Sequence, residues 1–260
     1  MSCLLNRQPT KTLDEISGFS GYFREIGDAV ERIAVCQDEE QLVGLLRETT
    51  ALLGASASYF VTFLREDRSF DSYNLLLACE PLWGLEYERG DCYEHDPWLA
   101  YARSHSAPAR GTDIPFRTER ERFVALLGKT FGFRSVVVAP TPTAGTMDRL
   151  GMLVLGSDEE GFFEAEGYSP LGLVARAVSM GLHERRAVLA RQEFIAGEKL
   201  RPEELDLLRH EWQGHCSKSI AKMMGTSPGA IDARFDRLNA KLRSPNRRVS
   251  SRLAAAYGLL

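Results

Sequence analysis

Long apolar runs are absent from the sequence. Its longest stretch without a charged residue, 49–64, has 16 residues and includes Thr, Ser and Gly, whereas a membrane-spanning helix needs about 20 mostly apolar residues. The first 11 residues place no apolar core behind a basic segment, so a signal peptide is not expected. The sequence therefore predicts a cytoplasmic protein without a membrane partner.

Cysteine is scarce and scattered. The chain has five cysteines, with no Cys-x-x-Cys spacing and no grouping with histidine: Cys3, Cys36, Cys79, Cys92 and Cys216. A disulfide framework needs an even set of cysteines, and a structural zinc site needs clustered ligands. We therefore expect neither of these, and no metal or other cofactor.

Signatures of catalysis and of repeat architecture are also missing. The sequence contains no phosphate-binding glycine loop, no nucleophile elbow, no motif of paired carboxylates and no metal-ligand set, which are the usual marks of an enzyme active site. It shows no internal repeat of 20–50 residues, as a solenoid or propeller would. An enzyme is therefore not expected.

Charge is present in ordinary amount but is distributed unevenly along the 260 residues. Residues 200–260 contain 11 Lys or Arg against 6 Asp or Glu, whereas residues 1–199 contain 21 against 30. A short basic end on an acidic body is typical of a regulator that carries a nucleic-acid-binding module. A chain of this length commonly forms two domains.

Hydrophobic periodicity places helices before and after a group of strands. Helices are expected within 13–54 and over 81–89, 97–104, 118–131 and 162–192, with 167–170 as a candidate break in the last one. Strands are expected over 57–64, 72–79, 135–139 and 150–155. This order predicts an α+β domain over residues 12–191. The polar segment 192–199, with Gly197 as a hinge, is expected to link it to an all-helical end at 200–260.

Spacing also predicts which faces of two helices are apolar. One face of the helix near residue 30 is expected to consist of Phe23, Ile26, Val30 and Ile33. One face of the helix over 118–131, opposite Glu121, is expected to consist of Phe123, Leu126, Leu127 and Thr130.

Residues 200–260 carry the pattern of a helix-turn-helix. Ser217 is expected to cap a short helix over 218–224, and Ser227 with Pro228 begins a second helix over 228–243. In this motif the second helix enters the major groove of DNA. The candidate DNA contacts are Ser217, Lys218, Ser227, Ala230, Ala233, Arg234, Arg237, Lys241, Arg247 and Arg248. For Arg247 and Arg248 the alternative is a structural role, as a helix cap or a partner of an acid.

Three segments in this region resemble the DNA-binding domain of LuxR-type transcription regulators, in the family's order: LRPEELDLL, GHCSKSIAKMMGTSPGAID and KLRSPNRRVSSRLAAAYGLL. The sequence departs from the family at His215, where Lys or Arg is usual, and at Ser219, where Glu is common. Asp232 and Asp236 are unusual on a recognition helix. A carboxylate repels phosphate, but it can accept a hydrogen bond from cytosine N4.

A second segment resembles the acyl-homoserine-lactone-binding domain of the same family. Trp83 and Tyr87 lie four residues apart, on one helix face, and Asp96-Pro97 follows nine residues later. The resemblance implies an α-β-α sandwich that encloses the signal between the sheet and one helical layer. It also implies that Trp83 donates to the lactone carbonyl, that Asp96 accepts the amide N–H and that Tyr87 either donates to the acyl carbonyl or closes the site.

Further candidate ligand contacts are expected on the strands and at positions where the chain departs from the family. Apolar walls for the acyl tail are available at Tyr59, Val61 and Leu77. The chain departs from the family at three positions. The family often has a Trp where this chain has Gly111, a hydroxyl where it has Val154 and an aromatic residue where it has Cys79. The alternative for each residue taken singly is structural: a lone Trp is usually core, and an Asp before Pro is usually a cap.

The combined prediction is a cytoplasmic, homodimeric transcription regulator of the quorum-sensing type. It would bind an N-acyl homoserine lactone or a related small signal, dimerise through residues 171–189 and 253–260, and bind palindromic double-stranded DNA. Two alternatives are a regulator of the same fold that needs no signal, and a protein that sequesters a related regulator in heterodimers without binding DNA itself. Asp232 and Asp236 support the last alternative.

Overall fold

The structure is a computed structural model that describes residues 11–64, 72–142 and 149–260. The chain divides into an N-terminal unit, which comprises Met1–Thr62 and Tyr73–Arg185, and a C-terminal unit, which comprises Phe63–Ser72 and Arg186–Leu260. Among the described residues, no helix is long and apolar enough to cross a membrane. The cysteines in this part of the chain are free thiols, and Cys3 lies outside it.

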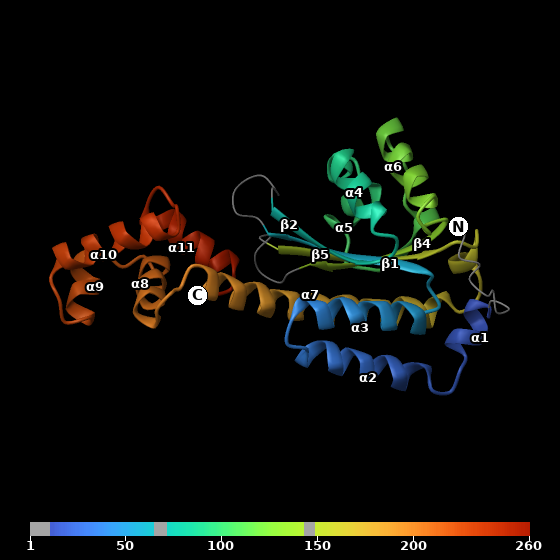
Figure 1. Cartoon of the computed structure of the whole chain (residues 1–260), viewed down its shortest axis with the longest axis horizontal. Coiled ribbons are helices and arrows are strands. Elements are labelled where there is room, and N and C mark those ends of the chain that lie inside the picture. Colours follow the sequence, from blue (N-terminus) through green and yellow to red (C-terminus); the bar gives the residue numbers. More distant parts are fainter. Residues whose placement is uncertain (1–10, 65–71, 143–148) are drawn as a thin grey trace. The chain divides into compact units, whose positions relative to one another are not determined.

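A five-stranded sheet forms the centre of the N-terminal unit (Figure 1), in the order β2-β1-β5-β4-β3. The strands are β1 (Ala57–Leu64), β2 (Ser72–Ala78), β3 (Ala109–Arg110), β4 (Ser135–Pro142) and β5 (Arg149–Ser157). β4 pairs antiparallel with β5, with Val138 opposite Val154, and β3 pairs antiparallel with β4, with Ala109 opposite Val138. Four of these strands match the predicted ones, and β3 was not predicted.

Helices cover both faces of the sheet (Figure 1), which confirms the predicted α+β sandwich. On one side lie α2 (Tyr22–Val35), α3 (Glu39–Leu52) and the first part of α7 (Tyr168–Gly197). On the other lie α4 (Leu82–Arg89), α5 (Pro97–Ala102) and α6 (Glu119–Lys129). Buried hydroxyls fasten the first layer: Thr50 of α3 lies 2.5 Å from Ser58 of β1, and Ser179 of α7 donates to the Ala139 carbonyl at 2.7 Å.

Local sequence signals explain where several helices begin. Thr12 forms a capping box with Glu15 at the start of α1 (Leu13–Ser17), and Thr118 forms one with Glu121 at the start of α6. In each box the threonine hydroxyl accepts from the backbone N–H of the glutamate, and the glutamate carboxylate accepts from the backbone N–H of the threonine. These interactions satisfy donors that the helix itself leaves unpaired.

The predicted apolar face of α6 is wrong. The helix buries Val124, Ala125 and Gly128, whereas Phe123 and Leu126 are 60% and 63% exposed. A Cβ added to Gly128 would lie 3.2 Å from Cη2 of Trp98 and 3.7 Å from Cη2 of Trp83. Small residues face the sheet because two indole rings already fill the space below the helix.

Two further expectations need correction. On α2 the buried residues are Tyr22, Ile26, Ala29 and Ile33, and Phe23, expected among them, is 55% exposed. The helical stretch expected over 162–192 is divided near its candidate break: a 3-10 helix covers Phe162–Glu164, and α7 begins at Tyr168 but continues beyond the expected end to Gly197. Most of the segment expected as a linker, 192–199, is therefore helical, and the division between the two units falls within α7.

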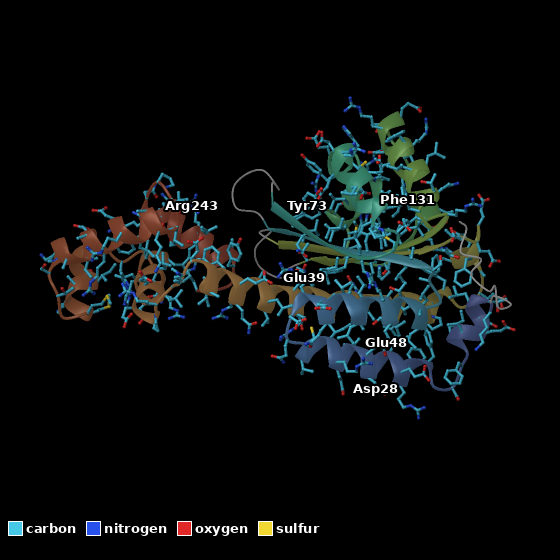
Figure 2. All side chains as sticks on the ribbon, in the orientation of Figure 1. Asp28, Glu39, Glu48, Tyr73, Phe131 and Arg243 are labelled. Atoms are coloured by element: carbon cyan, nitrogen blue, oxygen red, sulfur yellow. The ribbon has the colours of Figure 1, made fainter. Side chains whose placement is uncertain are left out.

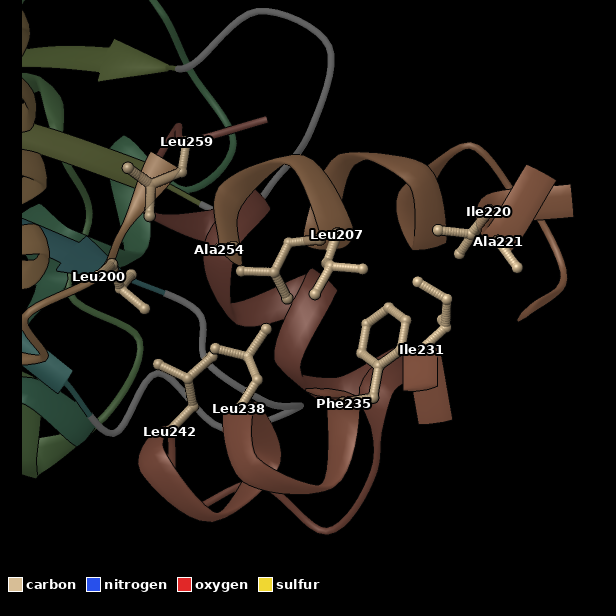
Figure 3. Packing of buried hydrophobic residues seen from close by; sticks show 11 residues of the cluster. Leu200, Leu207, Ile220, Ala221, Ile231, Phe235, Leu238, Leu242, Ala254 and Leu259 are labelled. Carbon is tan, nitrogen blue, oxygen red and sulfur yellow. The ribbon is translucent and has the colours of Figure 1, made fainter. Parts of the chain in front are cut away.

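Four helices enclose a separate core in the C-terminal unit: α8 (Pro202–Trp212), α9 (Ser217–Met223), α10 (Pro228–Lys241) and α11 (Arg247–Ala256). Figure 3 shows the side chains of one α10 face, Ile231, Phe235 and Leu238, directed toward residues of the other helices such as Leu207 and Ala254. The spacing of 4 and 3 residues along α10 predicted this face, and its burial confirms the prediction.

The turn between α9 and α10 follows its sequence signals in part. Ser227 accepts from the Ala230 N–H at 3.2 Å and Pro228 occupies the first helical position, as predicted. Gly225, between the two helices, has a φ of +64°, which glycine adopts without steric cost. The expected cap at Ser217 is wrong: Cys216 has the extended backbone of a cap residue, and Ser217 is the first residue of α9. The Ser217 hydroxyl donates to Asp232 of α10.

Candidate functional site

An aromatic cluster lies between the sheet and the layer of α4, α5 and α6. Its members are Tyr59, Trp83, Tyr87, Trp98, Phe131 and Phe133, and the ring centroids of contacting pairs lie 5.4–6.4 Å apart. Phe131, which follows α6, is labelled in Figure 2. Rings at these separations add specific edge and offset contacts to ordinary apolar packing. The cluster therefore brings together side chains from β1, α4, α5 and the segment between α6 and β4.

Two polar atoms in the aromatic cluster are buried without a hydrogen-bond partner among the described residues. They are the indole Nε1 of Trp83 and the hydroxyl oxygen of Tyr59, and the two side chains belong to residues that are 0% and 1% exposed. A buried donor left unpaired costs about 1–3 kcal/mol, and native proteins leave few such groups. Both atoms can donate to a carbonyl oxygen.

Asp96 forms hydrogen bonds through both of its carboxylate oxygens. Its Oδ1 accepts from the backbone N–H groups of Trp98 and Leu99 at 2.8 and 3.2 Å, which caps α5. Its Oδ2 accepts from the Tyr87 hydroxyl at 2.7 Å. The cap role, which was the structural alternative for Asp96 in the sequence, is thus present. The carboxylate also binds Tyr87 of the aromatic cluster and is close enough to Tyr59 to raise its pKa.

Burial dominates the electrostatics of this group. It raises the pKa of Asp96, and the hydrogen bonds from Tyr87, Leu99 and Trp98 oppose the rise. Burial and then the nearby charge of Asp96 raise the pKa values of Tyr59 and Tyr87 well above their usual range. Both phenols are therefore protonated at neutral pH, and the Tyr59 hydroxyl is close enough to Asp96 for the carboxylate to raise its pKa.

The remaining predicted ligand residues lie on the same face of the sheet. Val61 follows Tyr59 at the strand repeat of two residues, so it shares that face. Leu77 meets α4, since a Cβ added to Gly84 would lie 2.9 Å from its Cδ1.

On the other half of the sheet, Val154 and Gly156 lie two residues apart on β5 and therefore share a face. A Cβ added to Gly156 would lie 2.4 Å from Cδ1 of Phe133. A Cβ added to Gly111 would lie 3.1 Å from Cβ of Val136, which is opposite Gly156 in the ladder. The structure thus brings all eight predicted ligand residues to one side of the sheet.

Three members of the aromatic cluster were not predicted from the sequence: Trp98, Phe131 and Phe133. Trp98 immediately follows Pro97, and Phe131 and Phe133 flank Gly132, which has a φ of +96°. A Cβ on Gly132 would lie 2.9 Å from Cβ of Ala57, so both backbone conformation and space favour glycine there. The signal available in the sequence was the Phe-Gly-Phe run at the end of a predicted helix.

The second candidate site is the outer surface of the helix-turn-helix. A groove of about 380 Å³ lies between the start of α8 and one flank of α10, and it is lined by Arg201, Glu203, Glu204, Leu207, Arg234, Arg237 and Lys241. Four of the lining side chains are cations and two are carboxylates. Arg237 is exposed and Arg234 is half-buried, so the guanidinium groups of α10 are placed at the surface where an anion can reach them.

Lys241 is held inside the unit. Its Nζ donates to Glu204 Oε2 at 2.7 Å and to the Lys199 carbonyl at 2.9 Å. Although partial burial acts in the opposite direction, the hydrogen bond from Lys241 helps to hold the pKa of Glu204 below its usual value. The predicted DNA contact at Lys241 therefore competes with a salt bridge that joins α10 to α8.

Arg247 is also engaged, which is the alternative weighed for it from the sequence. Its Nε lies 2.9 Å from Glu211 Oε2, and its Nη1 donates to the Ser217 hydroxyl at 2.8 Å. The other predicted contacts differ in accessibility: Lys218, Ser227 and Arg248 are exposed, and Ala230 and Ala233 are half-buried.

Comparisons with known proteins identify the fold. The sequence matches no protein-family model and no curated protein. Escherichia coli SdiA superposes with a TM-score of 0.70 at 15% identity, over 92% of this chain and 98% of that one. SdiA in complex with octanoyl-rac-glycerol gives 0.68 at 14% identity, over 92% and 97%.

A third similar structure matches a smaller part of the chain. The N-acylhomoserine lactone dependent LuxR family transcription factor CepR2 from Burkholderia cenocepacia gives a TM-score of 0.55 at 16% identity, over 65% of this chain and 98% of that one. The fold described above is therefore that of SdiA along almost the whole chain, including both the sandwich and the helical end.

Proposed function

We propose that this chain is a LuxR-type transcription regulator, in which the N-terminal unit binds a small acyl signal and the C-terminal unit binds DNA. The buried donors of Trp83 and Tyr59, which have no hydrogen-bond partner among the described residues, support the proposal most directly. Hydrophobic walls with a few convergent polar groups are the usual composition of a small-molecule site. The similarity in fold to SdiA, which is described in complex with octanoyl-rac-glycerol, and to CepR2, which is described as N-acylhomoserine lactone dependent, agrees with this assignment.

The chemistry of an acyl homoserine lactone matches the three polar groups. The indole Nε1 of Trp83 donates to the ring carbonyl, and the carboxylate of Asp96 accepts the amide N–H in a charge-assisted bond. The Tyr59 hydroxyl donates to the acyl carbonyl. Val154 carries no hydroxyl for that carbonyl, and Tyr59, on the same face of the sheet, offers one instead.

The C-terminal unit provides the output. Its net positive charge and its surface arginines on α10 suit contact with the DNA backbone and major groove. A homodimer, with contacts from α7 and from residues 253–260, presents two such units to a palindromic site in the cytoplasm. Within the N-terminal unit, α7 exposes Leu173 and Met180, which are 65% and 40% accessible.

Ligand binding is tested by unfolding the full chain in the presence of N-acyl homoserine lactones of increasing chain length and of octanoyl-rac-glycerol. A ligand that binds only the folded state, at about a thousand times its dissociation constant, adds about 4 kcal/mol to stability. We expect at least one compound to raise the melting temperature. Trp83→Phe should reduce that rise because it removes the indole donor, whereas Trp212→Phe, at a Trp that is 51% exposed, should not.

Two other outcomes correspond to the alternatives. If no compound stabilises the protein and it still selects a specific duplex from a random library, it is a regulator that needs no signal, and the close contacts within the aromatic cluster are simply its core. If the full chain binds no duplex, alone or with ligand, the sequestering role supported by Asp232 replaces the regulator proposed here.

A further inference from the structure

A polar network joins α8, α9, α10 and α11 in the C-terminal unit. Ser217 of α9 donates to Asp232 Oδ1 of α10 at 2.6 Å, and Arg247 of α11 donates to the same Ser217 hydroxyl at 2.8 Å. Arg247 also lies 2.9 Å from Glu211 of α8 and 4.0 Å from Asp232 Oδ1. The network fixes the start of α9 against the first half of α10.

The network has an inner end and an outer end. Glu211 is the inner end, with a side chain that is 14% exposed, and the Arg247 guanidinium carbon lies 5.5 Å from the centre of the Phe235 ring. Asp232 is the outer end, with a side chain that is 61% exposed. Its carboxylate is therefore oriented by a bond from Ser217 while most of its surface stays open.

Asp232 also occupies a position suited to reading a base. It is the fifth residue of α10, and the N-terminal residues of the second helix of a helix-turn-helix contact base edges in the major groove. Its neighbours Ile231 and Phe235 are buried in the core. The acid therefore lies on the flank of α10 beside α9, opposite to the flank that carries Arg234 and Lys241.

We propose that Asp232 is a specificity-determining residue that accepts a hydrogen bond from the N4 amino group of a cytosine, once in each half-site. This inference rests on the DNA-binding function proposed above. A carboxylate can only accept hydrogen bonds. In the major groove guanine presents two acceptors and thymine presents an acceptor and a methyl group, whereas cytosine presents a donor.

Adenine also presents an amino donor in the major groove, but a carboxylate, which can only accept hydrogen bonds, disfavours it. Beside its N6 donor, adenine presents the N7 acceptor, which faces the second carboxylate oxygen in a bidentate approach. An asparagine side chain has both a donor and an acceptor and suits adenine instead. Exchange of the acid for its amide should therefore change the preferred base.

Repulsion between Asp232 and the DNA phosphates is moderated by its surroundings. Arg247 is within 4.0 Å of its carboxylate, and Lys218, the residue after its partner Ser217, is exposed. A purely structural role for Asp232 would require only an acceptor for the Ser217 hydroxyl, which an asparagine side chain also provides. The amide variant therefore separates base recognition from helix–helix attachment.

The test is a selection of binding sites from a random duplex library by the full-length protein and its Asp232→Asn variant. For the wild type we expect one position per half-site at which cytosine is preferred by about 5- to 150-fold in affinity, the range of a good base contact. In Asp232→Asn this preference should disappear or move to adenine. The matched control Asp236→Asn, one turn further along the same helix and also exposed, should select the wild-type site.

A second measurement changes the DNA and leaves the protein intact. The cytosine is replaced by an analogue without the N4 amino group, which should weaken binding of the wild type and not of Asp232→Asn, while the same replacement outside the site has no effect. An identical selected site for wild type and Asp232→Asn overturns the assignment of Asp232 but not the DNA-binding function. Failure of the wild type to select any duplex overturns both.

Discussion

The hydrogen bond between Tyr87 and Asp96 leads to a prediction of stability that can be worked out from its geometry. Asp96→Ala removes the cap of α5, which costs about 1 kcal/mol, and leaves the buried Tyr87 hydroxyl without an acceptor, which costs about 1–3 kcal/mol. The expected loss in the free energy of unfolding is therefore about 2–4 kcal/mol. Asp96→Asn keeps a cap acceptor and can donate to the Tyr87 oxygen, so its loss should be much smaller.

Asp96 should also make the free energy of unfolding depend on pH. Burial raises the pKa of folded Asp96 above its ordinary value of 3.8, so the folded state holds this proton at pH values at which the unfolded chain has released it. The contribution of Asp96 to the free energy of unfolding should then decrease as the pH rises from 3.8 through the raised pKa, and stay constant above it. Asp96→Asn lacks this proton, so the wild type should lose stability relative to it over that window.

Urea unfolding at several pH values measures both effects. Trp83 and Trp98 lie in the aromatic cluster and Trp212 lies in the C-terminal unit, so a Trp212→Phe background lets tryptophan fluorescence report on the N-terminal unit. Tyr87→Phe is the matched control, because it removes the hydroxyl and keeps the cap. The reasoning is refuted if Asp96→Ala unfolds at the same urea concentration as the wild type, or if wild type and Asp96→Asn show the same pH dependence.

Three further predictions follow from other parts of the chain. Arg248→Ala should weaken binding to all duplexes and reduce the slope of log affinity against log salt by about 1. Arg234→Ala should instead reduce the binding free energy by about 1–3 kcal/mol, through one base pair only. Fluorescence anisotropy measures both effects, and equal behaviour of the two variants would contradict the placement of α10 in the groove. Gly156→Ala should destabilise the N-terminal unit in thermal unfolding, because the added Cβ would lie 2.4 Å from Phe133 and 2.5 Å from the Gly132 carbonyl oxygen. The control Gly27→Ala places its Cβ where no atom lies within 4 Å, so it should stabilise α2 by about 1 kcal/mol. A fragment of residues 186–260 should fold as a helical domain, because it contains the whole core of the C-terminal helices and the stacked Phe194–Tyr257 pair. It should bind a palindromic duplex more weakly than the full chain. Equal affinity would show that the N-terminal unit is not needed for dimeric binding.

The helix-turn-helix shows how much local sequence can determine. Ser227 and Pro228 set the start of α10, and the spacing of Ile231, Phe235 and Leu238 sets its buried face. These signals act within one or two helical turns, so they can be recognised without knowledge of the rest of the chain. The order of helices and strands, with helices before and after a group of strands, predicted an α+β domain in the same way, whereas the sandwich was implied by the family resemblance.

Side-chain partners distant in the sequence were decided only by the tertiary structure. The periodicity of α6 is compatible with burial of Phe123 or of Val124, and the indole rings of Trp83 and Trp98 select the smaller face. Whether a basic residue on a helix meets solvent or an acid depends on which helix packs beside it, as Lys241 with Glu204 shows.

The candidate ligand site combines both kinds of information. The sequence by itself determined the residue types at Trp83, Tyr87 and Asp96 and their spacing along the chain. The tertiary structure decided that Tyr59 and Phe133 complete the aromatic cluster and that two donors in it have no partner among the described residues. Spacing along a helix defines a local direction, whereas burial and hydrogen-bond pairing depend on surfaces that the folded chain brings together from distant segments.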